Sequence, residues 1–145
     1  MEEEKNNQVA VNLKTTIFQD GERQDFEFVE QGNLVKMSNG LYLRFKEHQD
    51  DKEVATVTIK ITDEHVQLTR KDEMGHQSRL IFNEEKIHKT AYQTQFGALK
   101  IEVKTKEINC EIIEDDNSGS LMIDYELYTG GMIVGEYNIR LHFSA

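Results

Sequence analysis

The stretch Leu121-Met122-Ile123-Asp124-Tyr125-Glu126-Leu127 alternates apolar and polar side chains without a break. The same alternation recurs along the chain, at residues 9–17, 41–45, 57–61, 99–103 and 137–143. A period of two places every second side chain on one face, which is typical of a half-buried β-strand. Antiparallel sheets with one wet face produce this pattern, whereas parallel sheets give continuous apolar runs. The sequence therefore predicts an antiparallel all-β protein.

About ten such segments, joined by short connections, favour an up-and-down meander. An open sheet of this size would expose two edge strands, and the chain contains no proline with which to block them. Closure removes the edges, so we expect a single antiparallel up-and-down β-barrel of about 8–10 strands. A barrel of that size is either filled by side chains or holds one small ligand.

The domain organisation is simple, because no linker or repeat divides the chain. We expect residues 1–7 to form a disordered acidic tail and residues 8–145 to form the one barrel domain. Within the barrel, Gly32-Asn33 is expected to end one strand, and residues 99–106 and 107–114 are expected to be separate segments.

The charge balance disfavours two classes of partner. A net charge of −10 opposes binding to nucleic acids and to anionic lipid surfaces, because both require clustered lysine and arginine. The first residues, Met1-Glu2-Glu3-Glu4-Lys5, lack the basic head and apolar stretch of a signal peptide. No segment approaches the ~20 apolar residues of a membrane-spanning helix. The expected location is the cytoplasm.

Several segments together resemble the YwiB-like family of small bacterial β-barrel proteins. They are Glu30-Gln31-Gly32-Asn33-Leu34, Leu41-Tyr42-Leu43-Arg44-Phe45, Thr69-Arg70, Tyr92-Gln93-Thr94-Gln95-Phe96-Gly97, Leu121 to Leu127 and Tyr137-Asn138-Ile139-Arg140-Leu141. The resemblance implies a calycin-like or lipocalin-like barrel, a bacterial source and a cytoplasmic location, and it supplies no activity. The chain departs from the family at Asp72, where the family tends to have a glycine; here the glycine, Gly75, comes later.

Arg70 is the first candidate site residue. It is in phase with Val66 and Leu68, so its stem should point toward the core. A buried guanidinium needs a carboxylate or several carbonyl acceptors, because an unpaired buried charge is very costly. Arg70 could anchor an anionic or carbonyl group of a ligand in a cavity, or it could close one end of the barrel by packing on an aromatic ring and bonding to backbone carbonyls. The second, structural interpretation is favoured.

Three hydroxyl-bearing residues complete the candidate site. Tyr92 and Thr94 share one face of a strand, and Tyr125 is in phase with Ile123 and Leu127. Their hydroxyls could orient a ligand in an apolar lining. The alternative is that the tyrosines pack in the core and the threonine bonds to nearby backbone.

Cysteine and histidine offer little chemistry. Cys110 is the only cysteine and is in phase with Ile108 and Ile112, so we expect it to be buried and slow to react. No two of the five histidines have the spacing of a local metal chelate, so neither a metal nor a cofactor is predicted.

The preferred hypothesis is a cytoplasmic, non-enzymatic barrel that binds a small apolar or amphipathic molecule in its interior through Arg70, Tyr92, Thr94 and Tyr125. The alternative is a filled barrel that acts as a protein-interaction module or as a homodimer. The two differ in whether the interior is empty. Bulky inward candidates count against a large cavity; they are Phe28, Phe45, Phe82, Tyr125 and Phe143.

Overall fold

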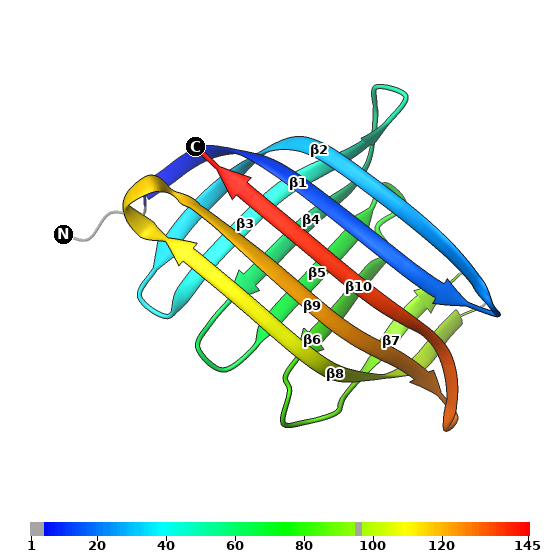
Figure 1. Ribbon diagram of the computed structural model, residues 1–145. Helices are drawn as coiled ribbons and strands as arrows, with labels where there is room; N and C mark the ends of the chain where they lie inside the picture. The colour runs from blue at the N-terminus through cyan, green and yellow to red at the C-terminus, as the bar shows by residue number, and fades with distance from the viewer. Residues whose placement is uncertain (1–4, 95–96) are drawn as a thin grey trace.

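The chain folds into ten antiparallel strands that form a nearly closed barrel (Figure 1). The computed structural model describes residues 5–94 and 97–145, with the backbone alone described at residues 5, 6, 92–94 and 114. The strands are β1 (Lys5–Gln19), β2 (Glu22–Met37), β3 (Gly40–Gln49), β4 (Lys52–Ile61), β5 (Val66–Asp72), β6 (Gln77–Phe82), β7 (His88–Thr94), β8 (Gly97–Ile113), β9 (Ser118–Thr129) and β10 (Met132–Ser144). A short 3-10 turn, η1 (Glu114–Asp116), joins β8 to β9. The predicted barrel is confirmed.

The sheet is a meander closed by its first and last strands. Its order is β6-β5-β4-β3-β2-β1-β10-β9-β8-β7, so β1 pairs with β10, and the seam lies between β6 and β7. Polar contacts cross this seam. The Asn83 N–H donates to Thr105 Oγ1 over 3.1 Å, and the Ile108 N–H donates to the Glu84 carboxylate over 2.9 Å. These bonds tie the end of β6 to β8 where no backbone ladder joins them.

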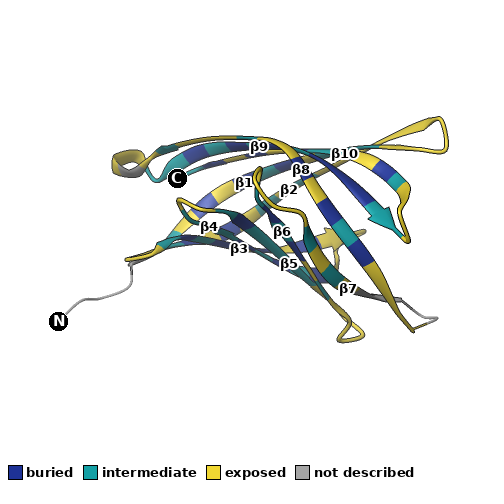
Figure 2. Cartoon of the chain, turned by 90° about the horizontal axis from the view of Figure 1, so that it is seen from below, coloured by how far each residue is buried: buried dark blue, intermediate teal, exposed yellow. Residues whose placement is uncertain are grey.

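The barrel interior is filled by inward side chains of β1 to β6 and β8 to β10. Figure 2 shows the resulting alternation of buried and exposed residues, most plainly along β8. The largest fully buried side chains include Phe45, Phe82 and Phe143, and Tyr125 is also buried. Of the bulky inward candidates only Phe28 is half-buried rather than buried.

Two expected strand breaks are absent, because one long strand replaces each pair of segments. β2 runs through Gly32 without interruption. A Cβ on Gly32 would lie 2.9 Å from Val11 Cγ2 and 3.2 Å from Phe45 Cβ, so glycine permits close packing here and does not end the strand. β8 is likewise continuous, and a bulge between Thr105 and Glu107 moves the inward positions from odd to even residues.

The start of β1 and the turn after Arg70 also differ in detail from expectation. β1 begins at Lys5 rather than at residue 8, because Asn6 and Asn7 already pair with β2. After β5, the Asp72 carboxylate accepts hydrogen bonds from the Met74 and His76 N–H groups, at 3.0 and 2.8 Å. Desolvation raises the pKa of Asp72, but these bonds and the charge of His76 outweigh it, so the pKa is lowered overall. The Asp72 carboxylate thus caps the turn that follows β5.

Two long strands run beyond their partners and leave open edges. β2 pairs with β1 from Glu22 onward, but its ladder with β3 covers only residues 32–37. β8 pairs with β9 to Ile113, but β7 covers only residues 97–103. Each open edge therefore lies beside a gap in the barrel wall. Among the described residues, no helix is long and apolar enough to cross a membrane.

Candidate functional site

Arg70 lies at the end of the barrel formed by the β3–β4 and β5–β6 hairpins, and its partner is a carboxylate of the protein. Its Nε donates to Glu47 Oε1 over 2.8 Å. The Glu47 side chain is only 6% exposed, whereas the Arg70 side chain is 41% exposed. Both residues are on inward positions of their strands. The pair therefore crosses the inner face of β4, which lies between β3 and β5, and closes this end of the core. The position at the barrel end agrees with the structural interpretation of Arg70, but the partner is a carboxylate rather than backbone carbonyls.

Tyr125 is part of the packed core. Its ring centroid lies 4.6 Å from that of Phe82 and 5.1 Å from that of Tyr137, with which it stacks at 9°. Along β6, Phe82 is four residues from Ser78, which pairs with Arg70. At about 3.3 Å per residue, Tyr125 and Arg70 are therefore about 13 Å apart along the strand direction. The structure does not bring these two candidates together.

Tyr92 and Thr94 belong to β7, where they pair with Leu99 and Gly97. Their side chains lie outside the described part of the structure. A ligand-binding role for Arg70, Tyr92, Thr94 and Tyr125 therefore stays a prediction.

A groove opens at the end of the barrel that holds both chain termini. It has a volume of about 1190 Å³ and lies between the open edge of β8 and the hairpins β2–β3 and β4–β5, beside the β6–β7 connection. Figure 2 shows η1 and the C terminus in one layer here, with β3–β5 in the facing layer. No local pattern in the sequence indicates this groove, because the groove depends on where β7 begins to pair with β8.

The floor of the groove is apolar and its rim is charged. The floor is formed by inward side chains at strand ends, which are Leu41, Ile61, Val66, Ile108, Cys110 and Ile112. The rim comes from the three connections, with Lys36, Asp63, Glu64, His65, Glu84, Glu85 and Lys86 among its residues. An apolar floor below a polar rim suits an elongated amphipathic ligand.

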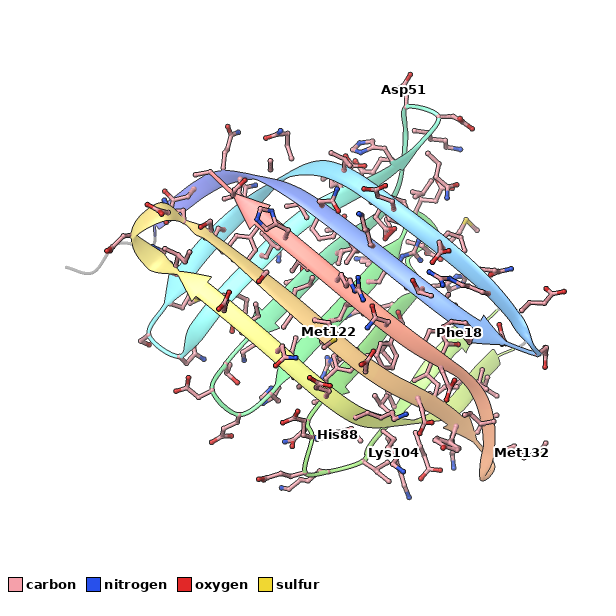
Figure 3. All side chains as sticks on the ribbon, viewed as in Figure 1. Phe18, Asp51, His88, Lys104, Met122 and Met132 are labelled. Carbon is pink, nitrogen blue, oxygen red and sulfur yellow. The ribbon has the colours of Figure 1, made fainter. Side chains whose placement is uncertain are left out.

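Another pocket, of about 650 Å³, lies on the outer face of β1, β10, β9 and β8. Its side chains are mainly outward and polar, among them Lys14, Glu111, Arg140 and His142. Met122, labelled in Figure 3, is an apolar side chain of this surface. Because most of the side chains that line this pocket are polar and face outward, the groove at the barrel end is the better candidate.

Cys110 lies in the groove, and its expected burial is wrong. The predicted inward position of Cys110 is confirmed, because the residue pairs with Leu121 and shares a face with Ile108 and Ile112. The residue is nevertheless exposed, because the β8 edge has no partner strand to cover it. Desolvation by its surroundings raises the pKa of the thiol. Within the described residues, no group of three or more metal-ligating side chains is placed to hold an ion.

We predict that the native protein reacts completely with iodoacetamide at Cys110 without denaturant. The rate at neutral pH should be lower than that of a small free thiol, because a raised pKa leaves less thiolate. It should keep rising at pH values where the free thiol has reached its plateau. Mass spectrometry of quenched time points measures both rates. A reaction that requires unfolding would contradict the open groove.

The fold defines a small β-barrel with a packed interior and a groove at one end. The model of a family described as "Domain of unknown function (DUF1934)" matches residues 11–141, and the chain belongs to this family. It is 26% identical to the uncharacterized β-barrel protein YwiB of Bacillus subtilis (strain 168) over 122 residues, which are 84% of this chain and 82% of that protein.

The solved structures show the same fold. The crystal structure of the ywiB protein from Bacillus subtilis matches with a TM-score of 0.81 at 20% sequence identity. The match covers 98% of this chain and 94% of that chain. The YwiB-like resemblance and the bacterial barrel class are therefore confirmed.

Proposed function

We propose that this barrel is a non-enzymatic binding protein. It holds an amphipathic small molecule in the groove at the barrel end where β1 begins and β10 ends. The observation that carries the proposal is the row Ile108, Cys110 and Ile112, which faces inward and has no strand to cover it. Burying such apolar surface contributes about 25 cal/mol per Å². An alkyl chain lying along this row would supply the missing cover.

The filled core determines where such a ligand can lie. Phe45, Phe82 and Phe143 occupy the barrel interior, so the calycin-like mode of binding deep in the centre is not supported. The groove volume of about 1190 Å³ is at the upper limit of ordinary ligand pockets. The rim holds more carboxylates than lysines, so it could meet a cationic head group; the carboxylates are Asp63, Glu64, Glu84 and Glu85.

A cytoplasmic location is part of the same proposal. Its support is Cys110, a free and exposed thiol that a reducing compartment would keep reduced. Cys110 thus supports both the proposed function, as part of the groove floor, and the proposed location.

The test uses dodecanoate, dodecanol and dodecylamine as probes. We expect dodecylamine, which is a cation at neutral pH, to bind best, to raise the melting temperature of the protein and to slow iodoacetamide labelling of Cys110. Ile112→Gln should weaken this binding about tenfold, because it places an amide on the apolar floor. Ile113→Gln is the matched control, since Ile113 is the adjacent residue, lies on the opposite face of β8 and is 54% exposed.

Isothermal titration calorimetry gives the affinities. Equal effects of the two substitutions would contradict the groove as the site. The absence of saturable binding by all three probes would contradict the proposed function. Preference for dodecanoate over dodecylamine would contradict the role given to the rim carboxylates.

A further inference from the structure

The open edge of β2 is a preformed template for another strand. Residues 22–31 are paired with β1 in regular register, yet the ladder between β2 and β3 stops at Gly32 and Phe45. Figure 1 shows β2 continuing to its tip while the β3–β4 hairpin turns away, and Figure 3 labels Asp51 at the tip of that hairpin. Along residues 22–31, the backbone groups that face away from β1 have no partner strand.

Charge is the one protection against strand addition that this edge carries. Natural edges are blunted by charged side chains, especially lysine, and by proline, bulges or short length. The stretch Glu22-Arg23-Gln24-Asp25-Phe26-Glu27-Phe28-Val29-Glu30-Gln31 contains neither proline nor lysine, and its register with β1 has no bulge. What the edge does carry is negative charge.

The inner face of the edge exposes apolar surface. Phe26 and Phe28 share the face of the core, but Phe26 is 46% exposed because β3 has already ended its pairing. On the other face Val29 is 70% exposed. An added strand would cover Phe26 on one side and Val29 on the other.

The carboxylates flank this apolar surface on both faces. Asp25 and Glu27 are on the outer face, and Glu30 is on the inner face, where it accepts the His48 N–H over 2.9 Å. The single cation of the stretch, Arg23, is paired with Asp25 at 3.2 Å. The hydrogen bonds of Asp25 to Thr16 and Arg23 also lower the pKa of its carboxyl, so it stays charged. The edge therefore has an excess of negative charge.

This charge discriminates between the two kinds of strand that could add. A second copy would bring the same acidic stretch alongside, and like charges on paired strands are destabilising. A strand that alternates apolar residues with lysine or arginine would satisfy the backbone groups, the apolar surface and the charge together.

We propose that β2 residues 22–29 bind an extended basic segment of another protein, which adds to the barrel as an edge strand beyond the point where Glu30 contacts the N–H and Nδ1 of His48, at 2.9 and 3.0 Å. The inference is independent of the groove, which lies at the other end of the barrel. The backbone bonds would supply affinity, and the alternating side chains would supply selectivity.

The probe is a fluorescein-labelled peptide, Thr-Lys-Val-Arg-Val-Lys-Val-Thr. A second peptide has its central valine replaced by proline, and a third has glutamate in place of each basic residue. By fluorescence anisotropy we expect the first peptide to bind at least tenfold more tightly than either control, because proline removes ladder bonds and glutamate reverses the charge. Binding should weaken in high salt without being abolished.

Two phenylalanines provide a matched pair of variants. Phe26 and Phe18 are each 46% exposed, but Phe18 is on the outer face of β1, away from the open edge. Phe26→Ala should weaken the peptide about fivefold, and Phe18→Ala should change its affinity less than twofold. Ile112→Gln in the groove should leave peptide binding unchanged.

Three results would overturn the inference. Equal binding of the proline peptide would show charge attraction without strand addition. No binding of the basic peptide would show that the carboxylates only protect the edge. Native mass spectrometry showing a dimer that Phe26→Ala dissociates would assign the edge to a second copy of this chain.

Discussion

Replacing Phe82 with alanine is expected to lower the free energy of unfolding by about 3–5 kcal/mol, the usual loss for a buried phenylalanine. Phe82 is 0% exposed and ends β6, the last strand on one side of the sheet. Its ring contacts Tyr125 of β9, 4.6 Å between centroids, across the barrel seam. Typical domains are stable by about 5–15 kcal/mol, so the burial of this one side chain is a large share of barrel stability.

Urea titration followed by far-ultraviolet circular dichroism measures the effect, since the chain contains no tryptophan. Phe26→Ala is the control, and it should cost much less because Phe26 is 46% exposed. If both variants lose the same small amount, β6 is not held to the interior. In that case the barrel is an open sheet in solution.

The strands could be predicted because the inward or outward direction of each side chain follows from the local alternation of apolar and polar residues. The period of two placed Phe45, Phe82 and Phe143 inward, and all three are fully buried. The interior is therefore filled by residues that any reading of the alternation would select. The residues that each side chain contacts could not be predicted in this way, because they lie on strands that are distant in the sequence.

Cys110 and Phe26 show why burial was less predictable than direction. Both residues are on inward positions, and both are exposed. In each case the neighbouring strand pairs over only part of the length. β7 pairs with residues 97–103 of β8, and β3 pairs with residues 32–37 of β2. Nothing near Cys110 in the sequence records where β7 begins to pair with β8. The groove and the open edge arise from these mismatched strand lengths.

Arg70 illustrates the same limit for charged pairs. Its phase predicted an inward stem, but its partner is 23 residues away on β3. The partner could not be chosen among the 27 acidic residues of the chain. A bulge at the end of the β3–β4 ladder, between Glu47 and His48, lies beside the position where Glu47 meets Arg70.

Replacing Arg70 with methionine is expected to destabilise the ligand-free protein by about 1–3 kcal/mol. Methionine keeps much of the apolar stem, so the loss comes from leaving the Glu47 carboxylate without its cation. Fully buried pairs cost more when broken, about 3–5 kcal/mol. The smaller value applies because water reaches the Arg70 side chain, which is 41% exposed.

The double variant Arg70→Met with Glu47→Met separates the pair from the packing. Once neither charge is present, no carboxylate is left buried, so the double variant should recover much of the stability lost by Arg70→Met. Urea titrations of the wild type, the two single variants and the double variant give the coupling energy. If Arg70→Met is at least as stable as the wild type, the guanidinium is a burden in the ligand-free protein. Arg70 would then be a binding group for an anionic ligand, and the Glu47 contact would only hold it in place.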